Sequence, residues 1–130
     1  MREIKFRGKT KIKGEWVYGH HAKLGEEDII MVELKKTTNK QAAVDYAFYR
    51  VEPETVGRFI ERHDKNGKEA YEGDIVFVGN SWNENAVIFY DKDISAFVAQ
   101  FEKWGNKRIS KNTDFEVIGN IHDNKMEDLT

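Results

Sequence analysis

Two tryptophans with nearby cations are the residues whose type and spacing best suit a binding site. Trp82 lies in the polar segment 80–85, and Trp104 is followed closely by Lys107 and Arg108. An exposed indole can stack on a nucleobase while lysine and arginine neutralise phosphates, as in proteins that bind single-stranded nucleic acid. The alternative, which we favour, is that both rings pack against the fold or against a neighbouring subunit. These four residues are the candidate nucleic-acid contacts.

A histidine pair followed by acidic residues suggests a metal site. His20 and His21 precede Glu26, Glu27 and Asp28, and imidazole and carboxylate groups are common zinc ligands. Neighbouring residues of a strand point to opposite faces, so the two imidazoles cannot both bind one ion within a strand. We therefore predict neither a metal site nor a cofactor.

Groups that could carry catalysis are sparse. Glu72 and Asp74 flank Gly73, and paired carboxylates can act as acid and base when their pKa values differ. The same three residues also shape turns, which explains them without chemistry. Segment 64–68 contains glycine and lysine but lacks the several glycines and the following helix of a phosphate-binding loop. We assign no catalytic residues and predict that the chain is not an enzyme.

The composition indicates a small soluble protein. The 130 residues include 21 basic and 23 acidic side chains, and a formal charge of −2 creates no general attraction for nucleic acid or membranes. The absence of cysteine excludes disulfides and suits a reducing cytosol. No apolar run approaches the roughly 20 residues of a membrane helix, and no apolar segment of a signal peptide follows the charged start. We expect a protein of the bacterial host cytoplasm.

The charges are distributed unevenly along the chain. Basic side chains crowd the N-terminal segment, whereas acidic side chains crowd the C-terminal one, so the two could attract each other within or between subunits. The basic residues are Arg2, Lys5, Arg7, Lys9, Lys11 and Lys13, and the acidic ones are Asp114, Glu116, Asp123, Glu127 and Asp128.

Short runs of β-branched and aromatic residues recur between glycine, asparagine and aspartate clusters, which is typical of an all-β fold with little helix. The predicted strands span residues 2–7, 15–22, 28–34, 44–51, 54–60, 73–79, 85–91, 95–102 and 115–121. Segment 41–51 also fits helical spacing, but Tyr46, Phe48 and Tyr49 favour a strand.

Three glycines carry local predictions. Asn66 and Gly67 are the preferred pair of a two-residue type I′ hairpin turn, because both central residues of that turn need positive φ. We predict such a turn between strands that end near His63 and begin near Ala70. Gly57 and Gly119 each follow an aliphatic residue inside a strand, where glycine usually marks a bulge or a close backbone approach. We interpret these two strands as barrel-edge strands that could be neighbours.

The strand spacing predicts two regions packed as one compact unit. Residues 1–52 form an N-terminal β region and residues 53–130 form an SH3-like small β-barrel, with Pro53 at the junction. The barrel strands are joined by loops at residues 80–85, 91–93 and 105–112. The residues predicted to share one barrel core are Ile75, Phe77, Val87, Phe89, Val117 and Ile118.

Three separated segments resemble a known family. They are the opening strand 1–7, the central block of residues 55–59 and 64–76, and the closing strand 115–121. In this order they resemble the YopX family, small proteins found mainly in bacteriophages and prophages of Gram-positive bacteria. Residues 60–63, Ala70 and Lys125 depart from the family pattern and affect local loops. The resemblance implies a phage protein without an established biochemical activity.

Two functions from different classes follow. The first is a non-enzymatic phage or prophage accessory protein that acts as a homo-oligomer, because the strands of residues 1–50 leave more edges and aromatic surface than a monomer hides easily. The alternative is a nucleic-acid-binding small-barrel module in phage DNA or RNA metabolism. Salt separates the two, because nucleic-acid affinity falls steeply with salt whereas a hydrophobic oligomer persists.

Overall fold

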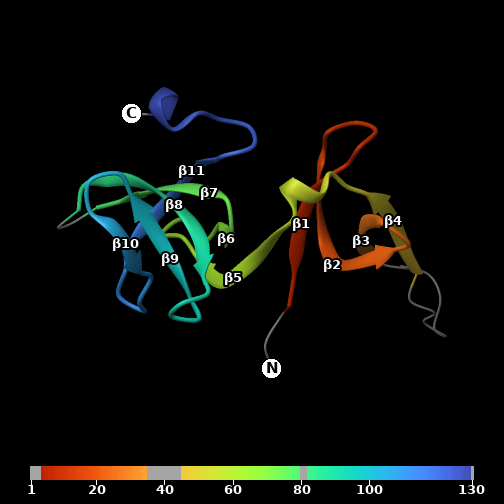
Figure 1. Cartoon of the computed structure of the whole chain (residues 1–130), viewed down its shortest axis with the longest axis horizontal. Coiled ribbons are helices and arrows are strands. Elements are labelled where there is room, and N and C mark those ends of the chain that lie inside the picture. Colours follow the sequence, from red (N-terminus) through yellow and green to blue (C-terminus); the bar gives the residue numbers. More distant parts are fainter. Residues whose placement is uncertain (1–3, 35–44, 80–81, 130) are drawn as a thin grey trace. The chain divides into compact units, whose positions relative to one another are not determined.

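The structure is a computed structural model that describes residues 4–34, 45–79 and 82–129 (Figure 1). Its regular structure is almost entirely β-strand, which confirms the all-β prediction. The chain divides into two compact units, Met1–Arg58 and Phe59–Thr130, and the division falls inside one strand, downstream of Pro53. Each unit is considered by itself below.

The N-terminal unit is an antiparallel sheet in the order β4-β3-β2-β1, followed by the first residues of β5. Its elements are β1 (Phe6–Lys9), β2 (Trp16–Leu24), β3 (Glu27–Leu34), β4 (Asp45–Arg50), the 3-10 turn η1 (Pro53–Thr55) and the start of β5 (Gly57–His63). Residues 2, 3 and 44 of the predicted strands lie outside the described residues.

The sheet of the N-terminal unit curls so that the end of β1 meets the end of β4. Thr10 bridges Val51, and the amide of Glu52 donates to the carbonyl of Lys9 (2.9 Å). Ile30 and Val51 of this unit are both fully buried. Pro53 begins a 3-10 turn, so the predicted strand 54–60 starts only at Gly57.

The C-terminal unit combines the rest of β5 and β6 with a five-stranded antiparallel sheet in the order β10-β9-β8-β7-β11. Its elements after β5 are β6 (Glu69–Tyr71), β7 (Asp74–Val78), β8 (Glu84–Asp91), β9 (Ala96–Phe101), β10 (Gly105–Arg108), β11 (Phe115–Asn120) and the 3-10 turn η2 (Met126–Leu129). The described strands form no closed barrel. Their pairing shifts between Val117 and Gly119, so a bulge, one of the two predicted features, lies at this glycine. Strand β11 pairs with β7 and not with β5, which begins at Gly57, so the two strands are not neighbours among the described strands.

The predicted loop 105–112 was wrong in its first half, because Gly105–Arg108 is strand β10. Its residues have little intrinsic strand preference, and pairing with β9 holds them extended. Within the described part of the chain the helical elements are 3-10 turns, and none is long and apolar enough to cross a membrane.

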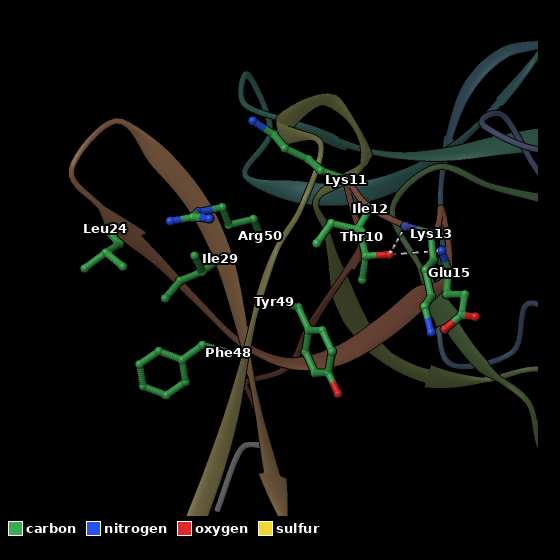
Figure 2. A pocket seen from close by; sticks show the side chains of 10 residues that line it. All are labelled: Thr10, Lys11, Ile12, Lys13, Glu15, Leu24, Ile29, Phe48, Tyr49 and Arg50. Carbon is green, nitrogen blue, oxygen red and sulfur yellow. Dashed lines mark hydrogen bonds between the residues drawn. The ribbon is translucent and has the colours of Figure 1, made fainter.

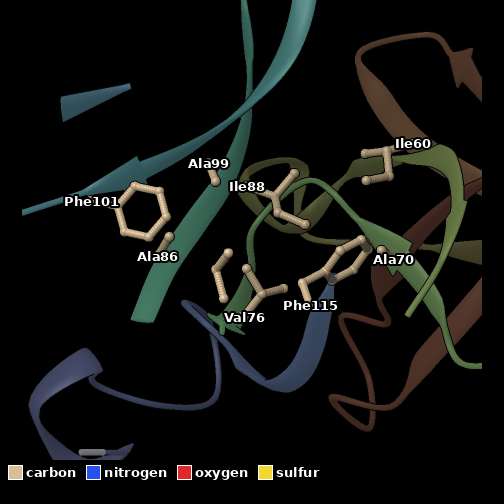
Figure 3. Close-up of a cluster of buried hydrophobic side chains, with 9 residues drawn as sticks. Ile60, Ala70, Val76, Ala86, Ile88, Ala99, Phe101 and Phe115 are labelled. Atoms are coloured by element: carbon tan, nitrogen blue, oxygen red, sulfur yellow. The ribbon is translucent and has the colours of Figure 1, made fainter. Parts of the chain in front are cut away.

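One continuous apolar cluster forms the core of the C-terminal unit (Figure 3). Its buried members are Ile60, Ala70, Val76, Val78, Ala86, Ile88, Ala99, Phe101 and Phe115. Neighbouring strands align these side chains, since Val76 lies opposite Ala86 and Ile88 lies opposite Ala99. Val117 packs against the cluster as a partly buried residue.

The predicted core register of β8 was wrong by one residue. Ala86 and Ile88 are buried, whereas Val87 and Phe89 are only half-buried. The physical reason is that the sheet is covered on both faces, since Ile75 and Val98 are also fully buried. Strands that are apolar on both sides do not reveal their core face through alternation.

The C-terminal segment contributes to the cover of the second face. The side-chain amide of Asn85 donates from Nδ2 to the backbone carbonyl of Leu129 (3.3 Å). A Cβ atom added at Gly119 would lie 3.0 Å from a methyl carbon of Leu129. Phe77 and Ile118, predicted for the core, are half-buried.

The hairpin between β5 and β6 was predicted correctly, but its turn type was not. The amide of Asp64 donates to the carbonyl of Lys68 (2.8 Å), so the loop has three residues, 65–67, instead of two. Gly67 has φ +84°, whereas Asn66 does not adopt positive φ. A three-residue loop that ends in a left-handed glycine is the next most common hairpin connection.

The side chain of Asp64 selects this turn. Its buried carboxylate accepts hydrogen bonds from the amides of Asn66 (2.8 Å), Lys68 (2.9 Å) and Val117 (2.9 Å). The first two bonds fix the loop, and the third joins the hairpin to β11. Burial raises the pKa of Asp64, but the three backbone hydrogen bonds outweigh it and hold the pKa below its usual value.

We expect Gly67→Val to destabilise the fold by about 1 kcal/mol or more, because a β-branched residue resists positive φ. No described atom lies within 4 Å of an added Cβ, so the effect is conformational rather than steric. Gly67→Asn is the matched control and should lose less, since asparagine tolerates the left-handed region. Urea unfolding measures both; an unchanged midpoint for the valine variant contradicts the turn assignment.

We expect the stability of the protein to decrease in acid partly through Asp64. A carboxylate whose folded pKa is lowered stabilises the fold above its unfolded pKa of about 3.9, and this contribution disappears as the pH falls through the folded pKa. Asp64→Asn should therefore be destabilised at pH 7 and show a flatter loss of stability toward pH 3. Asp93→Asn, at an exposed turn, should retain the wild-type slope. Urea unfolding between pH 3 and 7 tests this, and equal slopes for wild type and Asp64→Asn contradict it.

Candidate functional site

Strand β4 carries the strongest exposed aromatic surface of the N-terminal unit. Tyr46, Phe48 and Tyr49 are exposed by 42%, 61% and 39%. The strand pairs with β3 along one side, where Phe48 lies opposite Met31. Among the described residues, no strand pairs with the other side of β4 between Asp45 and Tyr49. Such an edge presents unpaired backbone groups together with large apolar side chains.

The hydrogen bonds at the end of β4 determine which backbone groups face the open edge. The amide of Val51 donates to Asp28 in β3 (3.0 Å), whereas the carbonyl of Arg50 faces away and accepts from the amide of Lys11 (3.0 Å). Backbone groups alternate in direction along an antiparallel strand. Tyr46 and Phe48 therefore direct their N–H and C=O groups to the open edge. The open edge stops at Arg50, because the carbonyl of Arg50 is already bonded to the amide of Lys11.

An open groove with a volume of about 710 Å³ lies beside this edge (Figure 2). Its apolar lining comes from Ile12 in the segment after β1, Leu24 and Ile29 in β2 and β3, and Phe48 and Tyr49 in β4. Ile12 and Leu24 are exposed by 91% and 58%. The cations that line it are Lys11, Lys13 and Arg50. The groove and the strand edge form one surface, which we call the β4 surface: residues Ile12, Leu24 and Asp45–Arg50.

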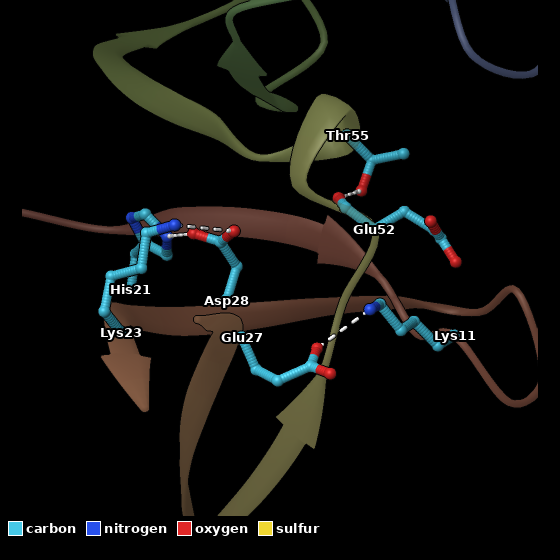
Figure 4. Close-up of polar contacts among 7 residues, drawn as sticks. All are labelled: Lys11, His21, Lys23, Glu27, Asp28, Glu52 and Thr55. Carbon is cyan, nitrogen blue, oxygen red and sulfur yellow. Dashed lines mark hydrogen bonds and ion pairs between the residues drawn. The ribbon is translucent and has the colours of Figure 1, made fainter. Parts of the chain in front are cut away.

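A polar network borders the β4 surface (Figure 4). Lys11 Nζ lies 2.8 Å from Glu27 Oε2, and this hydrogen bond raises the pKa of Lys11 and lowers the pKa of Glu27. The buried carboxylate of Asp28 contacts His21 Nε2 (2.8 Å) and Lys23 Nζ (3.3 Å). The hydrogen bond from His21 is the main cause that lowers the pKa of Asp28.

The structure separates the histidines as predicted. His21 contacts Asp28 and lies 5.4 Å from the ring of Phe6, whereas His20 lies beside Tyr46 at 6.5 Å between ring centroids. No group of three or more metal-ligating side chains comes together in the described ranges. Both histidines take part in contacts of the sheet.

Some of the basic side chains of the N-terminal segment make contacts within the fold. Arg7 is buried and its guanidinium lies 4.5 Å from the ring centroid of Trp16. Lys9 Nζ also lies over Trp16, at 5.7 Å. Arg2 is outside the described residues. Lys13, by contrast, is an exposed cation that lines the groove beside β4.

The acidic pair Glu72 and Asp74 has a structural arrangement. Asp74 is fully buried, and its carboxylate accepts from the amide of Tyr71 (2.7 Å). The amide of Gly73 donates to the carbonyl of Ile88 (2.8 Å), which fixes the turn before β7. The pair lies in a supported turn, as the simpler interpretation expected.

Three of the four candidate nucleic-acid residues come together in the C-terminal unit. Trp82 stacks on Phe101 at 5.3 Å, Trp104 meets the edge of Trp82 at 5.8 Å, and Lys107 Nζ lies 5.3 Å from the centroid of the Trp82 ring. Trp82 is half-buried against the core, whereas Trp104 is 48% exposed. The ring of Trp82 thus serves packing, and Trp104 offers accessible indole surface.

Arg108 does not join this cluster. Lys107 lies opposite Ala99 and Arg108 lies opposite Val98. Because consecutive strand residues point to opposite faces, the two cations diverge. The predicted loop over residues 105–112 would have allowed both cations on one side, whereas strand β10 does not.

The groove beside β4 was not predicted from the sequence. Ile12 stands alone between Lys11 and Lys13, and Leu24 precedes a turn at Gly25, so neither forms a recognisable pattern. They meet because residues 10–15 fold back toward the end of β4. An isolated isoleucine in a cationic turn was the available signal.

Comparison with known families gives one match, which covers nearly the whole chain. The model of the family described as YopX protein matches residues 5–126. No curated protein shows a significant match to the sequence.

Proposed function

The chain belongs to the YopX family, and from this premise we propose that it is a non-enzymatic phage or prophage accessory protein that acts as a homo-oligomeric β assembly. Its location is the bacterial host cytoplasm. The β4 surface carries the proposal, because it combines an unpaired strand edge with exposed aromatic side chains and an adjoining apolar groove. Natural proteins usually protect such an edge, and burial against another chain is a common way to do so.

The chemistry of the surface supports protein association over catalysis. The groove is lined mainly by aliphatic and aromatic side chains, and one of its three lining cations, Lys11, is engaged by Glu27. Aromatic residues beside arginine are typical of the centres of protein interfaces. Tyr46, Phe48 and Arg50 alternate along one side of β4, which gives that strand such a composition.

We propose that the C-terminal unit is a variant of the SH3-like small barrels. Strand β11 pairs with β7, and the amide of Ile121 donates to the carbonyl of Gly73 (2.9 Å). The last strand of the unit is thereby joined to the strand that opens its sheet, a pairing that barrel closure requires.

We expect Phe48→Glu to weaken the oligomer by about tenfold or more, because a buried charge replaces an aromatic contact and tenfold corresponds to about 1.4 kcal/mol. Tyr90→Glu is the control, as Tyr90 is an exposed aromatic residue of the C-terminal unit, outside the β4 surface. Light scattering over a concentration series measures the change, and circular dichroism verifies folding. Equal dissociation of the two variants contradicts a role for the β4 surface.

A second candidate function is nucleic-acid binding through Trp104 and Lys107. The exposed indole of Trp104 favours it, because this ring contacts Trp82, over which the cation of Lys107 lies. If this function holds, Trp104→Ala should reduce affinity for single-stranded DNA roughly tenfold, and Lys107→Ala should lower the salt slope by about one. Fluorescence anisotropy with a labelled oligonucleotide at several salt concentrations tests both. Absence of binding at low salt eliminates this candidate.

A further inference from the structure

We propose that β4 pairs with β4 of a second copy of the chain, antiparallel, around a two-fold axis at Ala47. This inference rests on the proposed function and specifies its partner and register. The occupant of the β4 surface is thus an identical strand, Asp45–Arg50 of the partner subunit.

The first step concerns symmetry. Two identical strands that join edge to edge in antiparallel direction are related by a two-fold axis perpendicular to the sheet, and this axis keeps each face on its own side. Directly opposed residues of an antiparallel pair also lie on the same face. The axis must therefore pass midway between one residue and its own copy, which lie directly opposite each other. We name the axis after this residue. Ala47 and Phe48 are the central residues of β4 that could occupy it.

The second step concerns the hydrogen bonds. Tyr46 and Phe48 direct their backbone groups to the open edge, whereas the carbonyl of Arg50 already accepts from Lys11. An axis at Phe48 would need Arg50 to exchange hydrogen bonds with the partner's Tyr46, where Lys11 lies. An axis at Ala47 places Tyr46 opposite the partner's Phe48, and Phe48 opposite the partner's Tyr46. Only these residues then form backbone hydrogen bonds between the two copies. This register provides about four backbone hydrogen bonds without displacing Lys11.

The third step concerns side chains and charge. With the axis at Ala47, Tyr46 lies beside the partner's Phe48 on one face, which forms two cross-strand aromatic pairs. The small methyl group of Ala47 meets its copy on the other face. The acidic end of β4 at Asp45 approaches the basic end at the partner's Arg50, whereas a parallel arrangement would bring like charges together.

The area available predicts a dimer of moderate affinity. A fully buried aromatic side chain removes roughly 200 Å² of surface from water. The exposed fractions of Tyr46, Phe48 and Tyr49 then supply about 300 Å² per copy. A standard interface buries about 800 Å² per partner. Ile12 and Leu24 in the groove, together with the backbone edge, must contribute the rest, so we expect dissociation in the micromolar range.

A single cysteine tests the register, because the chain contains no other. Around an axis at Ala47 the two copies of this residue form a pair without mutual hydrogen bonds, with Cα atoms about 4.5 Å apart. That distance lies within the range of about 4.4–6.8 Å for disulfides. Ala47→Cys at tens of micromolar under mild oxidation should therefore give a covalent dimer that reductant reverses.

Phe48→Cys is the matched control. In the proposed register its two copies are offset along the strand by two residues, so their Cα atoms lie about 8 Å or more apart and cannot be bridged.

Because Ala47→Cys replaces a half-buried residue, a second test uses exposed positions. Asp45→Cys mixed with Tyr49→Cys should give a mixed disulfide dimer, since these residues oppose each other, and neither variant alone should cross-link.

The outcomes separate this inference from the proposed function. Cross-linking of Ala47→Cys and of the mixed pair, without cross-linking of Phe48→Cys, supports the register. Preferential cross-linking of Phe48→Cys overturns the axis at Ala47. If light scattering shows an oligomer but none of these variants cross-links, the oligomer uses another surface and this inference is wrong. A monomeric wild type overturns the proposed function itself.

Discussion

Gly19→Ala is expected to unfold the N-terminal unit, with a loss of at least about 3 kcal/mol. Gly19 lies in β2 where the backbone of β3 approaches closely. An added Cβ atom would lie 2.1 Å from the carbonyl oxygen of Met31 and 3.3 Å from the Cα of Val32. Backbone atoms cannot move aside as a flexible side chain does, so the β2–β3 pairing must separate. The same pairing holds β4 at the edge of the sheet.

Gly25→Ala provides the control for this prediction. Gly25 lies in the β2–β3 turn with φ +65°, and no described atom lies within 4 Å of an added Cβ. We expect a loss of about 1 kcal/mol from the conformational preference alone. Urea unfolding with hydrogen exchange of β2 and β3 distinguishes the two variants. If Gly19→Ala retains the wild-type midpoint and protection, the close approach of these strands is wrong.

Ile88→Ala is expected to destabilise the C-terminal unit by about 3 kcal/mol, within the usual range for a buried isoleucine. Ile88 is fully buried in the apolar cluster, opposite Ala99, so its removal leaves a cavity that small neighbours cannot fill. Val87→Ala is the matched control, because Val87 is the preceding residue on the opposite face and only half-buried. It should lose about 1 kcal/mol. Thermal or urea unfolding gives the comparison, and a larger loss for Val87→Ala would restore the register predicted from sequence.

The strands themselves could be predicted because their local signals are strong. Tyr46, Phe48 and Tyr49 indicated a strand despite helical spacing, and β4 occupies that segment. Gly119 indicated a bulge and lies at one. These features depend on residues close together in sequence, where steric preference and side-chain alternation are sufficient.

Features that depend on distant partners could not be predicted. The turn type at Gly67 was missed although its determinant, the carboxylate of Asp64, is close in sequence. The bond that joins the hairpin to β11, from the amide of Val117 to Asp64, connects residues far apart along the chain. The register of β8 was hidden because apolar side chains cover both faces of its sheet. Strand β10 exists through pairing with β9, not through its own composition.

The candidate sites show the same division. The sequence indicated surplus aromatic surface on the strands of residues 1–50, without locating it at β4, and brought Trp82, Trp104 and Lys107 into one hypothesis. It could not place Arg108 on the other face, since that requires knowing that residues 105–108 are a strand. The groove beside β4 depends on the path of residues 10–15, which no local pattern encodes.

The mass of the wild-type protein in solution tests the central claim most directly. Light scattering at micromolar to tens of micromolar concentration, at low and moderate salt, should report at least twice the chain mass of 15.2 kDa. This mass should persist as salt is raised, because apolar contacts and backbone hydrogen bonds hold the assembly. A mass of 15.2 kDa throughout this range contradicts the account, and salt-sensitive binding of single-stranded DNA by that monomer would favour the nucleic-acid alternative.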